Sequence, residues 1–314
     1  MKQDIDKMKK IFVLLSTYNG QNYLCEQIDS ILSQENVKIH ILIRDDGSTD
    51  DTPKILEKYE RKYDNITVFE EKNIGCKSSF AQLMKYAQEP DVRVDYYAFA
   101  DQDDIWLPNK LASAIEMLDK EDNINIPVLY CSNLKVVDEK LNFVRFKYPE
   151  KDSFVTKGES LVCSMSTGCT MVFNRTALDM FLSKLPEDFI MHDLWMLHTC
   201  IFLGKVVYDK DAYILYRQHG ENVIGATMSL KDLLRRKIKS IRTIYNQHGF
   251  ETEARCILKA YSNDLNDEDK KLVAQVANYR NTAFAGKIKF LFSPTIKRKH
   301  NNFILVMRII IGRV

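Results

Sequence analysis

Three carboxylates, those of Asp101, Asp103 and Asp104, lie within a stretch of four residues directly after the apolar run 96–99. Carboxylates this close repel one another unless a cation lies between them or water solvates them all. Hard carboxylate oxygens suit Mg²⁺ or Mn²⁺, and these ions commonly connect a protein to the phosphates of its substrate. The alternative is a solvated acidic turn before the next helix. We favour a metal site at the Asp101 and Asp103 pair, because an apolar run precedes it and Trp106 follows it.

Residue types that suit a nucleoside occur earlier in the chain. Asp45 and Asp46 precede Gly47. An aspartate can accept a hydrogen bond from a ribose hydroxyl or from the N–H of a pyrimidine, and a glycine lets a ligand approach the backbone closely. An Asp-Gly pair is also a strong turn signal. The remaining polar candidates are weak signals when taken alone: Thr17, Tyr18, Asn19 and Asn73.

The second half of the chain contains another group of candidates. His192 and Asp193 precede a predicted buried helix that contains Trp195. A carboxylate at a helix start is usually a cap, and the functional alternative is a general base that removes a proton from an acceptor hydroxyl. Arg217 and His219 follow a predicted short strand. Both can contact a diphosphate, and a neutral His219 can also bind a metal, although a lone histidine more often has a structural role.

Short apolar runs alternate with helix-periodic segments in the first half of the chain. This alternation predicts an α/β fold with a mostly parallel, doubly wound sheet. The polar groups follow the predicted strands, and in such a sheet those strand ends share one edge, where ligands bind. Any one group can be a solvated turn, but four groups at one edge indicate a site. The predicted strands are 11–15, 39–43, 66–69 and 96–100.

The alternation loosens after Pro127. From residue 230 onward the pattern is helical, with Leu and Ile on one face and Lys and Arg largely on the other. The elements predicted between these points are a strand at 128–131, a small hairpin at 136–141, a β-segment at 166–173, a buried helix at 193–203, and short strands at 206–208 and 212–216.

The bulk properties are those of a folded soluble protein. The chain has 314 residues and a formal net charge of +2. Its seven cysteines include no C-x-x-C pair, which favours a reduced compartment over a disulfide framework or a zinc site. The run 11–15 is too short for a signal-peptide core, and the run 303–311 falls short of the roughly 20 residues that a spanning helix needs. We therefore predict a cytoplasmic protein.

The C-terminal segment is strongly basic. Residues 287–314 contain seven Lys or Arg and no Asp or Glu. Aromatic residues are not interleaved with these charges as on a nucleic-acid surface, so we expect no nucleic-acid partner. Basic amphipathic helices suit an anionic membrane surface. The alternative is a helical cap that packs on the main domain and leaves a solvated basic face.

Taken in order, the motifs resemble those of the family 2 glycosyltransferases with the GT-A fold, which has a Rossmann-like sheet with helices on both faces. The closest likeness is to the rhamnosyltransferase-like branch of bacterial capsule and cell-wall polysaccharide synthesis. The matching segments are S-T-Y-N-G (16–20), R-D-D-G-S-T-D (44–50), N-I-G (73–75), D-Q-D-D-I-W-L-P-N-K (101–110), S-T-G-C-T-M (166–171), M-H-D-L-W (191–195) and Y-R-Q-H-G (216–220).

This resemblance implies a role for each matching position. The catalytic base would be Asp193, and acceptor contacts are expected from His192 and Trp195, although many relatives have Glu-Asp where this chain has His-Asp. Mn²⁺ or Mg²⁺ would be bound by Asp101, Asp103 and His219. The nucleotide-binding residues would be Thr17, Tyr18, Asn19, Asp45, Asp46, Asn73, Asp101 and Arg217.

The resemblance also implies an activity and a domain organisation. A metal-dependent inverting enzyme would move rhamnose or a hexose from a nucleoside-diphosphate donor to a hydroxyl of a lipid-linked oligosaccharide. It would work in the cytoplasm, peripheral on the inner face of the plasma membrane. Residues 1–228 would form the catalytic domain, with a nucleotide-sugar half at about 1–125 and an acceptor half at about 126–228. Residues 229–314 would form a helical, basic C-terminal region.

Two other functions fit part of the pattern. A sugar-nucleotide pyrophosphorylase has a similar sheet but needs a glycine-rich, basic phosphate loop after its first strand, whereas residues 16–20 contain one glycine and no Lys or Arg. A non-catalytic protein that binds a nucleotide sugar is the other alternative, in which the carboxylates only bind. Replacing Asp193 separates this second alternative from a glycosyltransferase.

Overall fold

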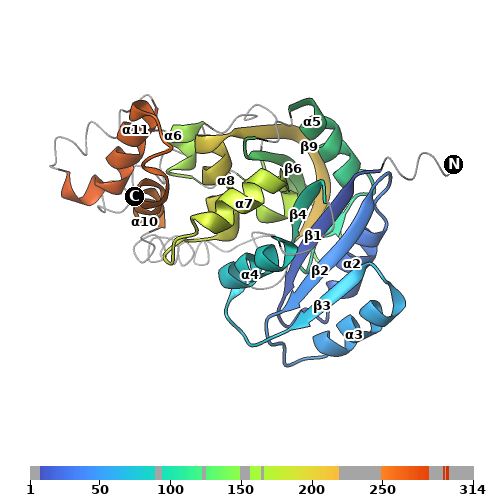
Figure 1. The fold of residues 1–314 in the computed structure, drawn as a ribbon. Coiled ribbons are helices and arrows are strands. Elements are labelled where there is room, and N and C mark those ends of the chain that lie inside the picture. Colours follow the sequence, from blue (N-terminus) through green and yellow to red (C-terminus); the bar gives the residue numbers. More distant parts are fainter. Residues whose placement is uncertain are drawn as a thin grey trace, which may run out of the picture.

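A central mixed β-sheet organises the chain (Figure 1). The computed structural model describes residues 8–88, 94–121, 125–148, 156–163, 166–218, 249–282, 293 and 295–296. In these residues the sheet has nine strands in the order β3-β2-β1-β4-β8-β6-β9-β5, with β7 paired to β6. The strands are β1 Lys10–Thr17, β2 Lys38–Asp45, β3 Ile66–Glu70, β4 Tyr96–Ala100, β5 Ile105–Trp106, β6 Val128–Val137, β7 Phe143–Phe146, β8 Val172–Asn174 and β9 Lys205–Arg217.

The first four strands are parallel and end at one edge of the sheet. Thr17 lies opposite Asp45, and Asp45 lies opposite Glu70 on the next strand. On the other side of β1, Leu15 pairs with Ala100 of β4. The predicted parallel arrangement is therefore confirmed, and the polar loops that follow these strands emerge side by side.

Helices cover both faces of this sheet, as a doubly wound fold requires. Because successive side chains of a strand point to opposite faces, Phe12 packs in one core and Val13 in the other. The first core includes residues from α4 (Cys76–Gln88), α7 (Arg175–Ser183) and α8 (His192–Leu203). The second core includes residues from α2 (Leu24–Leu32), α3 (Thr52–Lys62) and α5 (Lys110–Glu121).

The segment 166–173, predicted as one β-segment, is not a continuous strand. It forms a short 3₁₀ turn, η1 (Gly168–Thr170), before β8 begins at Val172. The N–H of Thr170 bonds back to the carbonyl of Thr167 at 2.9 Å, and that of Met171 bonds to Gly168 at 2.9 Å. These local bonds replace strand pairing. β8 then pairs antiparallel with both β4 and β6, so the second half of the sheet is mixed.

The two short strands predicted at 206–208 and 212–216 form one long strand, β9. Its pairing with β6 continues on both sides of the charged run 209–211, with register shifts at Ser132 and Asn133. The shifts in register accommodate the polar residues within β9. The sequence pattern had predicted a break between two strands at these residues. β5, a two-residue strand paired with β9, is too short for any sequence periodicity to predict.

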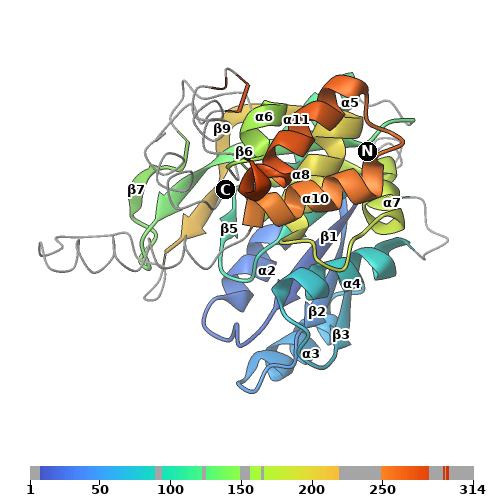
Figure 2. The ribbon, with the colours of Figure 1, turned by 90° about the vertical axis from the view of Figure 1, so that its left-hand side faces the viewer.

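The described C-terminal residues are helical and pack on the first core. α10 (Gly249–Tyr261) and α11 (Asp267–Ala277) lie beside α8 and the one-turn helix α6 (Lys157–Ser160) in Figures 1 and 2. The rings of Trp195 and Tyr261 stack with centroids 5.2 Å apart, and the hydroxyls of Thr199 and Tyr261 are 2.8 Å apart. The amphipathic segment at 230–244 lies outside the described residues. No helix in the described ranges combines the length and hydropathy needed to cross a membrane.

A buried polar pair connects α10 to α8. Nδ1 of His198 lies 3.4 Å from a carboxylate oxygen of Glu253, and Nε2 lies 3.1 Å from the carbonyl of Ser160. The ring therefore lies between a carboxylate oxygen and a backbone carbonyl. The second carboxylate oxygen of Glu253 accepts the N–H of Ile190 at 3.1 Å. This network joins α10 to the loop that precedes α8.

We expect Glu253→Ala to lower the free energy of unfolding by about 3 kcal/mol, because it removes the partner of Nδ1 in the buried His198 ring and the acceptor of the Ile190 N–H. Urea unfolding followed by circular dichroism measures this change. Glu57→Ala, which breaks an exposed pair with Arg61, is the matched control and should change stability by no more than about 0.5 kcal/mol. Equal effects of the two substitutions would contradict a structural role for the buried pair.

Candidate active site

The side chain of Gln102 fastens two of the strand-end loops together. Its Oε1 accepts hydrogen bonds from the Thr17 hydroxyl at 2.7 Å and from the N–H of Tyr18 at 2.8 Å, and its Nε2 donates to the Tyr18 carbonyl at 3.2 Å. A Cβ on Gly20 would lie 2.7 Å from both Gln102 Oε1 and Thr17 Oγ1, so a larger residue there would displace the Gln102 amide from these bonds. The amide thus fixes the loop after β1 against the carboxylate loop after β4.

The two aspartates after β2 are buried and hold backbone. Asp46 accepts the N–H groups of Ile74 at 2.8 Å and Gly75 at 2.9 Å, and Asp45 accepts the N–H of Ser48 at 3.1 Å. Their exposed fractions are both 3%. Both residues lie at the edge where we predicted nucleotide contacts, and their carboxylates shape the adjoining loops.

More exposed polar side chains form the rim of the same edge. Tyr18 is 46% exposed, and Asn73 is also exposed. Asn19 has a positive φ of 50° and accepts the N–H of Thr49 at 2.9 Å, while its own N–H donates to the Ser48 hydroxyl at 2.8 Å. Of the predicted nucleotide-binding side chains after β1 and β3, Tyr18, Asn19 and Asn73 are thus exposed, and the side-chain oxygen of Asn19 is already bonded to the Thr49 N–H.

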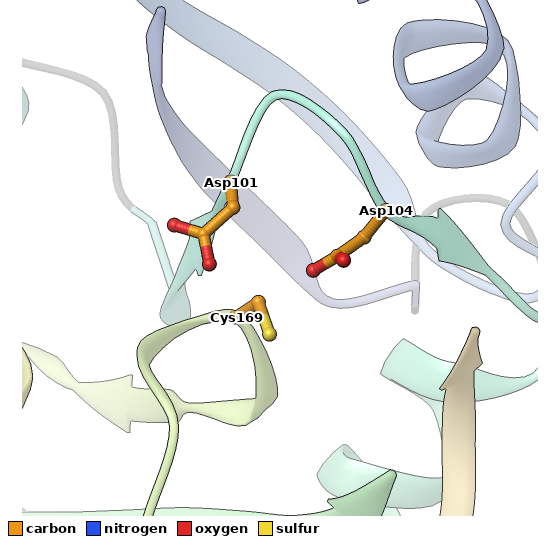
Figure 3. A group of neighbouring side chains, drawn as sticks. All are labelled: Asp101, Asp104 and Cys169. Atoms are coloured by element: carbon orange, nitrogen blue, oxygen red, sulfur yellow. The ribbon is translucent and has the colours of Figure 1, made fainter. Parts of the chain in front are cut away.

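Behind this rim, the loop after β4 faces the η1 turn across a small gap (Figure 3). A carboxylate oxygen of Asp101, a carboxylate oxygen of Asp104 and the sulfur of Cys169 lie within 4.8 Å of one another. Oδ2 of Asp104 is buried without a hydrogen-bond partner among the described residues. The predicted metal ligands Asp101 and Asp103 belong to this loop, and Asp104 and Cys169 add to it. His219 lies outside the described residues.

The electrostatics of this group favour a bound cation. Burial, then Asp103 and Asp193, raise the pKa of Asp101 to about 7. Burial, then Asp101 and Asp103, raise the pKa of Asp104 well above its usual value. The same burial and the neighbouring carboxylates keep the Cys169 thiol protonated by raising its pKa. Oxygen ligands and uncompensated negative charge suit Mg²⁺ or Mn²⁺, so the residues present fit such an ion.

Asp104 lies too far from the next helix to cap it, because α5 begins at Lys110. Lys110 itself is buried, and its ammonium lies 3.6 Å from the centroid of the Trp106 ring. Burial lowers its pKa to about 7, and the nearby Cys169 and Asp104 partly oppose this shift. A buried lysine therefore lies beneath the carboxylate group.

Arg217 does not offer its guanidinium to a diphosphate, as we had predicted. It is 6% exposed and donates to the carbonyls of Asp103 at 3.2 Å and Glu139 at 3.0 Å. It also forms an ion pair with Glu26 of α2, and its backbone N–H bonds to Asp104 Oδ1 at 3.3 Å. The prediction is therefore corrected: this arginine holds the carboxylate loop in place, because its donors are turned toward protein acceptors.

The predicted acceptor contacts of Trp195 and His192 are also wrong for these side chains. Trp195 is fully buried against Tyr261. The His192 ring stacks on Phe80 with centroids 3.8 Å apart and meets Phe99 edge to face at 4.8 Å. Both residues are in the core because α8 is covered by α4 on one side and by α10 on another.

Asp193, by contrast, is partly exposed and lies beside the carboxylate group. Its charge contributes to the raised pKa of Asp101 and to that of Cys76, which burial chiefly raises to about 12. A Cβ on Gly168 would lie 3.4 Å from Asp193 Cβ and 2.9 Å from His192 Nε2. The η1 turn therefore passes directly over the first turn of α8 and brings Asp193 next to Asp101.

One residue of this site, Lys147, carries no sequence signal that we could have used. It follows β7 in an ordinary Phe-Lys-Tyr run. Its ammonium donates to the hydroxyl of Thr167 at 2.6 Å, and its charge partly offsets the raised pKa of Asp101. Only the pairing of β7 with β6 brings it to the site (Figure 2).

Comparison with known proteins decides the family. The family described as glycosyl transferase family 2 matches residues 12–181. The chain belongs to this family. The chain is also 32% identical over 233 residues to the dTDP-rhamnosyl transferase RfbG of Shigella flexneri, which covers 69% of the chain and 75% of RfbG. The glycosyltransferase is 29% identical over 173 residues to the Escherichia coli protein named UDP-Glc:alpha-D-GlcNAc-diphosphoundecaprenol beta-1,3-glucosyltransferase WfgD, covering 54% of the chain and 62% of WfgD.

Solved structures share the fold of this glycosyltransferase. Staphylococcus aureus TarS 1–349, solved in complex with UDP-GlcNAc, superposes with a TM-score of 0.56 at 18% identity and covers 97% of the chain and 89% of TarS 1–349. The mannosyltransferase PcManGT of Pyrobaculum calidifontis, solved with GDP-Man and Mn²⁺, gives a TM-score of 0.54 at 15% identity, covering 99% and 90%. The GT-A fold inferred from the motifs is confirmed.

The buried imidazole of His192 should make stability depend on pH. Burial lowers its pKa to about 4 from an ordinary 6.5, so the unfolded state takes up a proton first as the pH falls. The stability associated with the neutral ring is complete above pH 6.5 and is lost toward pH 4, by at most about 1.4 kcal/mol per pH unit. Between pH 6.5 and 4.5 we expect the wild type to lose about 2 kcal/mol more than His192→Gln in urea unfolding. Identical losses would show that His192 is not held neutral.

Proposed function

We propose that this glycosyltransferase moves rhamnose or a hexose from a nucleoside-diphosphate donor to a hydroxyl of a lipid-linked oligosaccharide. The observation that carries the proposal is the position of Asp193, which lies against the η1 turn at the start of α8 and whose charge helps to raise the pKa of Asp101 from the other half of the chain. The names of RfbG and WfgD support a dTDP- or UDP-linked donor, and that of WfgD supports a diphosphate-lipid acceptor.

In this proposal the nucleoside binds at the rim formed by the loops after β1, β2 and β3. Tyr18 and Asn73 supply exposed side chains there, and the buried carboxylates of Asp45 and Asp46 keep the loops in shape. Thr17 is buried and its hydroxyl bonds to Gln102, so its role is to fix the loop that carries Tyr18. A site assembled from rigid loops loses little conformational entropy when it binds.

The metal would be Mn²⁺ or Mg²⁺, held by Asp101 and Asp103 with Asp104 beside them. The buried, unpartnered oxygen of Asp104 and the raised pKa of Asp101 both support a cation in this position. When bound, such an ion would offset negative charge on the donor diphosphate. His219 remains a proposed additional ligand from sequence alone.

Asp193 is the proposed general base. It takes the proton of the acceptor hydroxyl as that oxygen forms a bond to the anomeric carbon and the bond from this carbon to the diphosphate oxygen breaks. Attack from the face opposite the leaving group inverts the configuration, and no covalent enzyme intermediate is formed. The partly exposed carboxylate, in a first turn otherwise packed in the core, is suited to meet an acceptor from solution.

The proposed acceptor brings the enzyme to a membrane. A lipid-linked oligosaccharide lies at the cytoplasmic face of the plasma membrane, and a peripheral enzyme reaches it by binding that surface. The basic residues of 287–314 and the amphipathic pattern at 230–244 support binding to an anionic surface. Both segments lie outside the described residues, apart from positions 293, 295 and 296, so this part of the proposal rests on sequence.

Asp193→Asn should lower the transfer rate at least about 100-fold, because the amide cannot accept the hydroxyl proton. Transfer from UDP-Glc or dTDP-rhamnose to a lipid-diphosphate-linked sugar, measured by chromatography of the product, tests this. Donor affinity should stay within about twofold. Asp188→Asn, on the exposed loop just before α8, is the control and should keep full activity. If Asp193→Asn turns over at a near wild-type rate, Asp193 is not the general base. That result would favour a protein whose carboxylates only bind the nucleotide sugar.

Chelation tests the metal independently. Excess EDTA should abolish transfer, and added Mn²⁺ or Mg²⁺ should restore it. Asp103→Asn should raise the metal concentration for half-maximal activity about tenfold or more, since it removes a charged oxygen ligand. Asp64→Asn changes an exposed carboxylate after α3 and should leave the metal requirement unaltered. Undiminished activity in EDTA would be incompatible with the proposed metal.

A further inference from the structure

Lys147 is fixed at the wall of the carboxylate group by contacts from several elements. Its backbone N–H bonds to the carbonyl of Leu134 at 3.0 Å, which ties the end of β7 to β6. Its ammonium donates to the Thr167 hydroxyl at 2.6 Å. Thr167 immediately precedes Gly168 and Cys169, so this bond attaches the lysine to the turn that faces Asp101.

The same ammonium also lies near an aromatic ring. Nζ lies 5.3 Å from the centroid of the Tyr216 ring on β9. Tyr216 is adjacent to Arg217, which bonds to the loop of Asp103 and Asp104. The ammonium therefore contacts both the η1 turn and the strand that supports the carboxylate loop, and its charge partly offsets the raised pKa of Asp101 and of Cys169.

The negative charge of the site makes a cationic donor such as Lys147 important for binding an anionic ligand. A nucleoside diphosphate would bring further negative charge against carboxylates that already raise one another's pKa. Arg217 is committed to Glu26 and to backbone carbonyls. The Lys147 ammonium uses one of its three N–H donors in the bond to the Thr167 hydroxyl.

We infer that Lys147 binds the diphosphate of the donor and stabilises it as it departs, with its remaining N–H donors on the phosphate oxygens and Thr167 as its anchor. This inference rests on the proposed function, since it requires a nucleoside-diphosphate donor. The lysine forms no covalent bond and transfers no proton. As the bond from the anomeric carbon to the diphosphate breaks, its electron pair stays on the phosphate oxygen. The fixed ammonium interacts more strongly with that growing charge than with the intact donor.

Comparing nucleoside diphosphates with nucleoside monophosphates tests the assignment. Isothermal titration calorimetry at saturating Mn²⁺ would measure UDP, dTDP and GDP against UMP, dTMP and GMP. We expect Lys147→Met to weaken the diphosphate that the wild type binds by about tenfold or more, as the loss of a charge-assisted hydrogen bond predicts. The matching monophosphate should change by less than about twofold. Lys147→Arg should restore most of the diphosphate affinity, and Lys140→Met, in the exposed turn before β7, should have no effect.

The outcomes separate this inference from the function on which it rests. Equal losses for monophosphate and diphosphate would mean that Lys147 only supports the fold near Thr167, and unchanged affinity for both would mean that it contacts neither; each overturns the inference alone. If the wild type binds none of the diphosphates with Mn²⁺, the proposed donor class fails and the inference fails with it. Selective loss of diphosphate affinity that is rescued by arginine would establish the contact.

Discussion

At the carboxyl edge of the sheet, burial chiefly, and then the nearby Asp103 and Asp193, disfavour the ionised form of Asp101. Carboxylates separated this little are unfavourable in a protein interior without a compensating cation. The chain keeps them together because the backbone around them is held by other interactions. The site therefore favours a ligand that binds together with a cation, such as a diphosphate with its metal ion.

Several polar residues at this edge hold the arrangement in place. Gln102 joins the loops after β1 and β4, Asp46 holds the loop after β3, and Arg217 fixes the backbone of the carboxylate loop. Their hydrogen bonds are made within the protein before any ligand binds. Such preorganisation lowers the entropy lost on binding and keeps reacting groups within the narrow tolerances that catalysis needs.

The second half of the sheet serves the same site by a different route. β8 runs antiparallel to β4, and the η1 turn before it passes over the first turn of α8. Gly168 is required at that crossing, because a Cβ would collide with the His192 ring that Phe80 holds in place. α10 packs on α8 through Tyr261 and Glu253. The described C-terminal helices thereby belong to the core that positions Asp193.

The sequence by itself determined the parallel half of the sheet and the edge where the polar loops meet. Strand and helix periodicities are local, and parallel strands must end together, so Asp45, Asp101 and their neighbours could be placed in advance. Only the tertiary structure decided that Trp195 and Arg217 turn inward and that Cys169 and Lys147 face the carboxylates. These outcomes depend on which helices cover α8 and how β7 pairs, contacts between residues far apart in sequence that no local pattern records.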